Sequence, residues 1–235
     1  MRNWALIFLS SVAVLFCVNE ASARALGLVA AYSFEEGTGL TTADSSGNEN
    51  IGTLSRGVRW TAGKIGKAVW FSGTGGEIIV NDAPSLNFTG SFTLAAWIQP
   101  AAQKGYQTIL IKESTQGRCG YWLQTNGIQI NSGFSNGFGC IEHQTTTANL
   151  DTGKWYHIAS VLDRSNNTFK IYLNGDLILN VTEPATPVAN SQSLVFGRSG
   201  SSESKYERWN GAIDEVRIYN RALSQGEIRA HMSTH

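Results

Sequence analysis

The stretch Trp155–Leu162, with the sequence WYHIASVL, alternates as a β-strand does. Its two faces consist of Trp155, His157, Ala159 and Val161 on one side and Tyr156, Ile158, Ser160 and Leu162 on the other. Successive side chains of a strand point to opposite faces, and both faces here are largely apolar. This strand is therefore predicted to lie in the middle of a sandwich, covered on both sides. His157 stands among core-facing residues, which favours a packed structural histidine over a catalytic one.

Further strand-like segments, separated by turn residues, continue on both sides of this stretch. We expect strands at residues 28–34, 68–71, 77–80, 92–98, 108–111, 121–125, 128–131, 169–173, 177–181, 194–197 and 212–219. Asn126-Gly127 and Asn174-Gly175 each predict a type I′ hairpin. Ser224 and Glu227 have the spacing of a capping box, which predicts one short C-terminal helix. With no linker that separates two domains, the chain is predicted to form one all-β domain, a two-sheet antiparallel sandwich.

The charge balance limits the partners that the protein can have. The 235 residues include 18 lysines and arginines against 18 aspartates and glutamates, and charged residues make up only 15% of the chain. A neutral chain of this kind has no electrostatic footprint for nucleic acid or for an anionic membrane surface.

Residues 1–23 are predicted to be a secretory signal peptide, and residues 24–235 the mature domain. Arg2 precedes an apolar stretch at residues 4–18, and the exit pattern Ala21-Ser22-Ala23 follows. The overlapping Ala23-Arg24-Ala25 leaves the cleavage position open by two residues. The alternative is a membrane anchor, but the stretch is shorter than the roughly 20 residues that a span needs. We expect a secreted protein, periplasmic or extracellular, with no membrane span in the mature chain.

Removal of the signal peptide also removes Cys17 and leaves Cys119 and Cys140. Two cysteines in an exported protein suggest one disulfide, and two free thiols are the alternative. A bridge that closes a loop of roughly 20 residues stabilises the fold by about 3 kcal/mol in the chain-entropy model.

Several blocks of the chain resemble the laminin-G-like jelly-roll domains of the concanavalin A-like lectin/glucanase superfamily. These blocks are YSFEEG at 32–37, DSSGN at 44–48, GTL at 52–54, GKA at 66–68, FSG at 71–73, SFTLAAWI at 91–98, WYHIA at 155–159, YLNG at 172–175 and GAIDEVRIYNRALS at 211–224. They follow the order of the family and span nearly all of the mature chain. The resemblance implies a curved two-sheet jelly roll, commonly exported and often used to bind carbohydrate or another protein.

Catalysis has little support in the sequence. Retaining glucanases on this scaffold carry two carboxylates at alternate positions of one strand, Glu-x-Asp-x-(x)-Glu, and no such strand is present. Asp214 and Glu215 are adjacent, so their side chains are expected on opposite faces. The segment Ile141-Glu142-His143 resembles the Gln-x-His strand of polysaccharide lyases only loosely, and the Tyr-rich partner strand is missing. We predict that the protein is not an enzyme.

A structural calcium ion is suggested by the resemblance, because family members often hold one near the paired chain ends. The oxygen donors of the family-like blocks there are Glu35, Asp44, Asn48 and Asp214. Carboxylate, amide and backbone oxygens suit Ca²⁺, which takes six to eight hard ligands. The alternative is that the segment at 44–48 is only a turn and that Asp214 pairs with an arginine.

A carbohydrate-binding face is predicted around Trp122. Tyr121 and Leu123 match the inward pattern of their strand, which turns Trp122 and Gln124 to the other face. The predicted site comprises Trp122, Gln124, Phe134, Phe138 and His143. Such sites combine aromatic rings that stack on sugars with polar groups that bind the hydroxyls. The alternative is that these aromatics cover a sheet edge or fill the second sheet.

A second group, Tyr206, Glu207, Arg208 and Trp209, is better explained as a loop anchored by Trp209. The sequence therefore predicts a secreted, non-catalytic module that binds carbohydrate. A structural or protein-interaction domain without a sugar site is the alternative.

Overall fold

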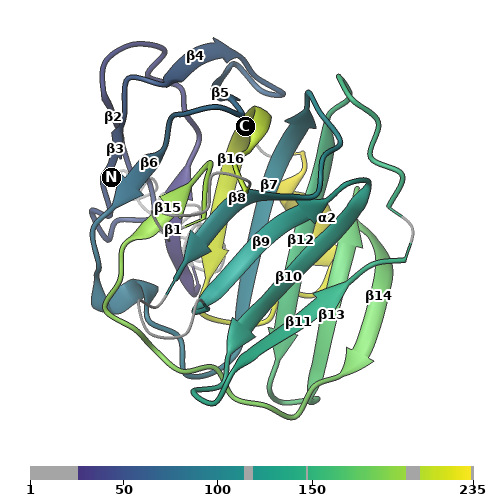
Figure 1. Ribbon diagram of the computed structural model, residues 1–235. Helices are drawn as coiled ribbons and strands as arrows, with labels where there is room; N and C mark the ends of the chain where they lie inside the picture. The colour runs from purple at the N-terminus through teal and green to yellow at the C-terminus, as the bar shows by residue number, and fades with distance from the viewer. Residues whose placement is uncertain (1–25, 114–118, 147, 200–206, 234–235) are drawn as a thin grey trace, which may run out of the picture.

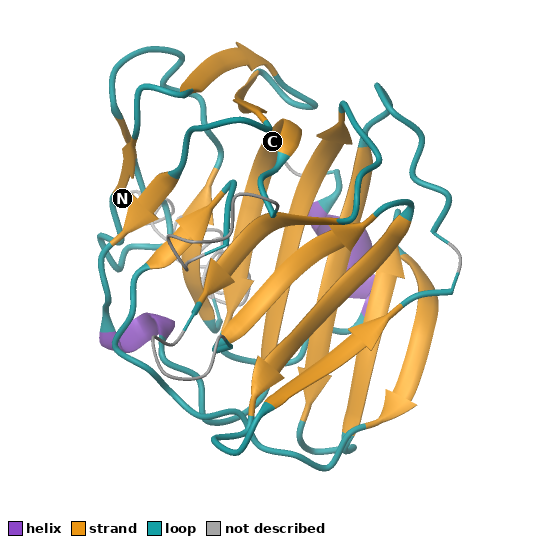
Figure 2. Cartoon of the chain, in the orientation of Figure 1, coloured by secondary structure: helices purple, strands orange, loops and turns teal. Residues whose placement is uncertain are grey.

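Two antiparallel sheets stacked face to face make up the fold, with one short helix behind them (Figure 1, Figure 2). A computed structural model of the chain describes residues 26–113, 119–146, 148–199 and 207–233. The predicted signal peptide lies outside these residues. Within them, no helix has the length and apolar character needed to cross a membrane.

Sheet A has the strand order β14-β13-β12-β7-β16-β5-β4, and β1 also pairs with β16. Its strands are β1 (Leu28–Tyr32), β4 (Val58–Ala62), β5 (Lys67–Ser72), β7 (Phe92–Pro100), β12 (Tyr156–Asp163), β13 (Thr168–Leu173), β14 (Asp176–Thr182) and β16 (Asn210–Tyr219). Sheet B has the order β11-β10-β9-β8-β15-β6-β3-β2. Its strands are β2 (Thr41–Thr42), β3 (Gly52–Leu54), β6 (Ile78–Val80), β8 (Tyr106–Lys112), β9 (Tyr121–Asn126), β10 (Gln129–Ser135), β11 (Cys140–Gln144) and β15 (Leu194–Phe196). The two-sheet antiparallel jelly roll is confirmed.

Strand β12 has the predicted central position. It pairs with β7 on one side and β13 on the other. Ile158 and Leu162 belong to the core between the sheets, whereas Ala159 and Val161 face outward beneath other apolar side chains. Both faces of the strand are therefore covered, as its alternation predicts.

The first and last strands pair, with Leu28 opposite Tyr219 and Tyr32 opposite Val216. The chain then continues into helix α2 (Gln225–His231), which begins at Ser224 with the predicted capping box. Ile228 of α2 and Leu223 pack on the outer face of sheet A with Ala159, Val161 and Tyr219. This helix covers sheet A from behind (Figure 2).

The two predicted hairpins form, with different turns. Asn174 and Gly175 have φ angles of 50° and 79° between β13 and β14, as a type I′ turn requires. In the other hairpin Asn126 pairs with Gln129, so the loop residues are Gly127 and Ile128. Only Gly127 of these two has a positive φ, 60°. The type I′ prediction at Asn126-Gly127 is wrong by one position, because the strand includes Asn126 and leaves glycine as the first loop residue.

Four strands were not expected from the sequence: β2, β3, β4 and β11. The first two are only two and three residues long. Strands β4 and β11 contain exposed and half-buried residues and no fully buried one, so they lack a clear apolar alternation. Buried aromatic residues fill the space between the sheets, and fully buried Trp209 anchors the chain ahead of β16 as expected.

Candidate binding face on sheet B

The outer face of sheet B is the side that faces the viewer in Figure 1, away from sheet A and α2. Tyr121 and Leu123 of β9 point into the core between the sheets, as predicted. Trp122 and Gln124 therefore point outward, and the strands that flank β9 place their own alternate side chains beside them. The outer face carries amides, a hydroxyl group and a carboxylate.

Trp122 lies beneath this face and does not offer its ring to solvent. It is only 5% exposed and packs with Ile111, Cys119 and Val195. Its indole Nε1 donates a 2.7 Å hydrogen bond to Oδ1 of Asn131, which is fully buried on β10. A ring that stacks on a sugar has to be exposed, so Trp122 does not have the position that the sequence prediction requires of it.

Tyr106 and Glu142, which sequence reasoning missed as site residues, provide the exposed part of the face. The Tyr106 hydroxyl donates to Oε1 of Glu142 over 3.1 Å. Tyr106 begins β8 and Glu142 lies on β11, and strands β9 and β10 run between them. With strands about 4.8 Å apart, three spacings amount to about 14 Å. The two side chains bridge this separation only when both extend along the sheet surface. The Tyr106 side chain therefore lies over the neighbouring strands.

The same carboxylate connects the exposed and buried parts of the face. Oε1 of Glu142 also accepts a 2.6 Å hydrogen bond from Nδ2 of Asn131, whose Oδ1 holds the indole of Trp122. Tyr106 remains 38% exposed, and Glu142 is exposed. Burial and the Glu142 carboxylate both raise the pKa of Tyr106, so its hydroxyl stays protonated and donates.

Amide side chains continue the face on either side of Tyr106. Gln124 is buried although it points outward, and its Nε2 donates to the Thr108 hydroxyl over 2.9 Å. Toward the hairpin end, Asn126 donates to Gln144, which in turn donates to Gln129 over 2.7 Å. These last three side chains are half-buried, so they border the exposed Tyr106 with hydrogen-bonding groups.

Two residues of the predicted site lie on the opposite side of sheet B. Phe134 is fully buried in the core between the sheets, where it packs against Phe92 and Phe169. His143 packs its ring 4.4 Å from Phe169, and its Nε2 lies 3.0 Å from the Glu183 carboxylate. Placing them on the Trp122 face is wrong. Strand β10 extends to Ser135, so alternation turns Phe134 inward, and His143 follows the same rule on β11.

Phe138 occupies a separate tip between β10 and β11 and is 100% exposed. Oδ1 of Asn136 accepts hydrogen bonds from the backbone N–H groups of Phe138 and Gly139, at 2.9 and 3.0 Å. The predicted disulfide between Cys119 and Cys140 is present and ties β11 to the segment before β9, with 5.6 Å between their Cα atoms. The exposed ring is therefore held on a braced turn.

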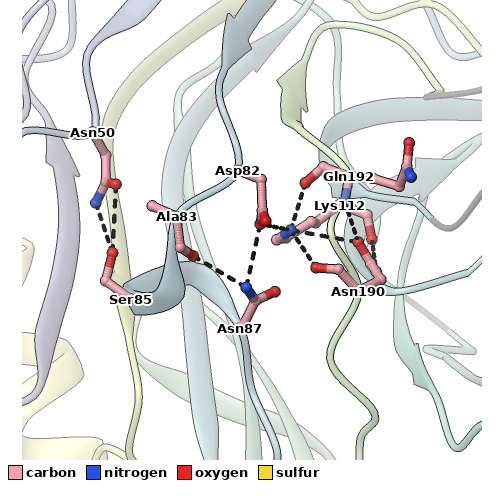
Figure 3. A network of polar contacts seen from close by, with 8 residues as sticks. All are labelled: Asn50, Asp82, Ala83, Ser85, Asn87, Lys112, Asn190 and Gln192. Carbon is pink, nitrogen blue, oxygen red and sulfur yellow. Dashed lines mark hydrogen bonds and ion pairs between the residues drawn. The ribbon is translucent and has the colours of Figure 1, made fainter.

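Lys112 fixes the far end of β8, the strand that begins with Tyr106. Its ammonium group is buried and donates to Oδ1 of Asp82 at 2.6 Å, to the Asn190 carbonyl at 2.8 Å and to the Gln192 carbonyl. Figure 3 shows Lys112 between Asp82 on one side and the 190–192 segment on the other. A buried ammonium surrounded by oxygens joins three segments and stabilises the position of β8.

Two further carboxylates, those of Glu113 and Glu207, lie near β8: Glu113 follows its last residue and Glu207 pairs with it through the backbone. The backbone of Glu207 accepts a hydrogen bond from Thr108 N at 3.1 Å. Ser199 donates from its hydroxyl to Oε2 of buried Glu113 at 3.0 Å. Burial, with a contribution from the charge of Glu113, raises the pKa of Glu207. Residues 200–206, including Tyr206 of the second predicted group, lie outside the described residues.

The four predicted calcium ligands lie in two places. Asp44 accepts hydrogen bonds from the backbone N–H groups of Ala31, Ser46 and Asn50, and Asn48 donates from Nδ2 to the Val29 carbonyl. Asp214 and Glu35 instead bind the turn between β4 and β5. Asp214 accepts from Lys64 N and Ile65 N, and Glu35 accepts from Lys67 N.

The carboxylates of Asp44, Asp214 and Glu35 already accept hydrogen bonds from backbone N–H groups. The partial positive charge of these N–H groups takes the place that a cation would occupy. Burial raises the pKa of Asp214 to about 7, although its hydrogen bonds to backbone N–H groups act in the opposite direction. Among the described residues, no group of three or more His, Cys, Asp or Glu side chains is placed to hold a metal ion. As they are arranged, the four residues fit a hydrogen-bonded role better than one cation site. The calcium ion stays a prediction.

Comparison with known families identifies the fold from an independent direction. The laminin G family model described as the concanavalin A-like lectin/glucanases superfamily matches residues 71–229, more than half of the chain. The chain belongs to this superfamily. The search of curated protein sequences found no match to this chain.

Solved structures with the same superfamily fold include toxin binding domains and one domain of a polysaccharide-degrading enzyme. The binding domain of Paraclostridial Mosquitocidal Protein 1 has a TM-score of 0.71 and 20% identity, over 87% of this chain and 51% of that chain. Domain 4 of AbnA, a GH43 extracellular arabinanase from Geobacillus stearothermophilus in complex with arabinotriose, has a TM-score of 0.66 and 24% identity. That match covers 87% of this chain and 97% of that chain.

A structure of botulinum neurotoxin type C has a TM-score of 0.70 and 15% identity, over 89% of this chain and 51% of that chain. It is described as a toxin whose cell entry depends upon interaction with two ganglioside molecules. This chain spans about half the length of the toxin chains that it matches. At these identities the likeness establishes a shared fold, and function has to be argued from the site.

Proposed function

We propose that this protein is a non-catalytic carbohydrate-binding module and that its glycan binds on the outer face of sheet B. The observation that supports this most directly is the contact between Tyr106 and Glu142. It holds a partly exposed aromatic ring beside an exposed carboxylate on a regular sheet. Sugars are bound by such a combination, because the ring contacts their C–H faces while polar groups bind their hydroxyls.

The proposed face is pre-organised. Glu142 is held by Asn131, which is itself held by Trp122, and the surrounding amides bond to one another. A side chain that is already ordered loses little conformational entropy when a ligand binds. This favours binding by an ordered surface over closure of a loop around the ligand.

The known proteins with this fold support the same class of function. The arabinanase domain was solved with arabinotriose, and the botulinum neurotoxin is described through its interaction with gangliosides. The Glu-x-Asp strand of the glucanases is missing from this sequence, which supports a role in binding without hydrolysis.

Retention on a panel of polysaccharides, measured by affinity electrophoresis, tests the proposal. Tyr106→Ala is expected to remove retention, because it deletes the exposed ring, while the melting temperature stays near that of the original protein. Tyr106→Phe keeps the ring and loses only the bond to Glu142, so it is expected to retain part of the affinity. Retention that is unaffected by Tyr106→Ala would exclude this face as the sugar site.

A protein-interaction role is a second candidate, supported by the braced tip that carries Phe138. Val188 lies beside this tip and is also exposed, and its backbone N–H donates to the Ser135 carbonyl at 2.9 Å. Phe138→Ala is a matched control for Tyr106→Ala, because it removes a second exposed ring from a different place. If only Phe138→Ala weakens retention, binding occurs at the tip and not at the sheet face.

A further inference from the structure

The charge of the sheet B face restricts the chemistry of its ligand. Glu142 uses Oε1 for both of its hydrogen bonds, from Tyr106 and from Asn131. Within the part of the chain that the structure describes, no donor reaches its Oε2 and no cation pairs with its carboxylate. An exposed anionic acceptor therefore remains available beside the Tyr106 ring.

Glu207 is a second acidic residue near this face. Its backbone lies against β8 at Thr108, two residues from Tyr106. The Glu207 carboxylate hydrogen-bonds Ser199, and its charge contributes less than that of Glu142 to the raised pKa of Tyr106. Lys104 and Arg208 are close in sequence to Tyr106 and Glu207, and neither forms an ion pair with a described carboxylate.

An unpaired carboxylate discriminates strongly between ligands. It accepts charge-assisted hydrogen bonds from hydroxyl groups, and these are about twice as strong as bonds between neutral groups. It repels a carboxylate or sulfate group of a ligand that binds next to it. Binding such a ligand would also remove water from two negative charges without pairing either of them.

Building on the proposed carbohydrate function, we infer that this face selects uncharged sugars. The ligand stacks the C–H face of a neutral sugar ring on Tyr106 and donates hydroxyl protons to Oε2 of Glu142. Uronic-acid, sialylated and sulfated sugars are excluded from this position by the carboxylate of Glu142.

Affinity electrophoresis against matched polymers tests the inference. The neutral probes are arabinan, β-glucan and galactomannan, and the anionic probes are polygalacturonate and chondroitin sulfate. The original protein is expected to be retarded by at least one neutral polymer and by neither anionic one, and Tyr106→Ala is expected to abolish that retardation.

Glu142→Gln isolates the effect of the charge, because glutamine keeps an Oε1 acceptor for Tyr106 and Asn131. Affinity for the neutral polymer is expected to fall about tenfold, since Oε2 is replaced by an N–H₂ donor. Interaction with the anionic polymers is expected to rise. Glu49→Gln removes the same charge from an exposed loop position and is expected to change neither, and near-UV circular dichroism checks that each variant is folded.

Tyr106-dependent retardation by an anionic polymer in the original protein would overturn this inference and leave the proposed carbohydrate function intact. The inference would also be overturned if Glu142→Gln kept the same preference for neutral over anionic polymers as the original protein. If no polymer is retarded in a Tyr106-dependent way, the proposed function fails, and the inference fails with it.

Discussion

Helix α2 covers an apolar cluster on the outer face of sheet A, whereas the outer face of sheet B from β8 to β11 ends in polar, partly exposed side chains. On sheet A, Ala95, Ala159, Val161, Tyr172 and Tyr219 form one buried cluster with Leu223 and Ile228. On sheet B the corresponding positions include Thr108, Gln124, Asn131 and Glu142, linked by hydrogen bonds. Both sheets contribute buried side chains to the core between them, and they differ in their outward side chains.

This difference is the basis for assigning a structural role to the outer face of sheet A and the proposed glycan site to that of sheet B. An apolar outward face has to be covered by the chain's own elements, and α2 does this for sheet A. The polar face of sheet B does not need such a cover, because its amides hydrogen-bond to their neighbours and its exposed carboxylate can be solvated. Variants on the two faces should therefore separate stability from ligand binding.

The largest effect on stability is expected from Ile228→Ala on the covered face. Ile228 is almost fully buried, so its loss leaves a cavity beneath α2 and is expected to cost about 3 kcal/mol of unfolding free energy. Chemical denaturation measures this loss, and polysaccharide retention at low temperature is expected to stay the same. A loss of retention with little loss of stability would contradict the assignment of the two faces.

Acid is expected to destabilise the covered face through its histidines. Burial, assisted by the nearby positive groups His231 and Arg217, lowers the pKa of His157 to about 3. Burial likewise lowers the pKa of His231 to about 4. The unfolded chain takes up these protons near its ordinary pKa of about 6.5, so their contribution is complete above that pH and is lost as pH falls below it.

The pH dependence of the unfolding free energy also includes Asp214, whose effect has the opposite sign to that of the histidines. Comparison of the original protein with His157→Gln therefore isolates the contribution of His157. The raised pKa of Asp214 favours the folded state at low pH, and that contribution is lost as pH rises toward about 7. Between pH 6 and pH 4 the stability of the original protein should fall more steeply than that of the variant, by up to about 1.4 kcal/mol per pH unit. Parallel pH profiles would mean that His157 is not held neutral by burial.

A smaller effect on stability is expected from Asn131→Ala on the polar face. The change leaves the Trp122 indole N–H without its acceptor in a buried position and costs about 2 kcal/mol. It also releases Glu142, so retention should weaken together with stability. Gln129→Ala serves for comparison, because it removes a half-buried amide of the same face that bonds to Gln144, and it is expected to cost less stability and less retention than Asn131→Ala. Unchanged retention in Asn131→Ala would show that Glu142 is positioned without Asn131.

The smallest effect is expected from removal of divalent ions. Because Asp44 and Asp214 already accept backbone hydrogen bonds, EDTA is expected to leave the melting temperature unchanged. A melting temperature that rises on addition of Ca²⁺ to the EDTA-treated protein would support the calcium ion predicted from the sequence.

The fold was predictable because its determinants are local patterns. The alternation of Trp155–Leu162, the Asn174-Gly175 turn and the capping box at Ser224 each specify an element without reference to distant residues. The proposed binding face depends on register across four strands. The meeting of Tyr106 with Glu142 follows from the pairing of β8 through β11, which a single sequence does not show.

The misplacement of Phe134 has a similarly specific cause. The predicted strand ends at residue 131, before Gly133 and Phe134, whereas Gly133 continues β10 and provides space for the Trp122 ring. A Cβ atom at Gly133 would lie 2.5 Å from the Trp122 ring. The small residue therefore marks close packing of an aromatic ring on a strand and not a break in that strand.

The most direct test of the proposed binding face is an NMR titration that follows the backbone amide chemical shifts. The ligand is a neutral oligosaccharide with the structure of the best-retained polymer. Perturbations are expected to cluster on β8 to β11, with the largest at Tyr106, Glu142 and Gln144, and those at α2 are expected to be negligible. Perturbations centred on α2 or confined to the Phe138 tip would contradict the assignment of sheet B as the binding face.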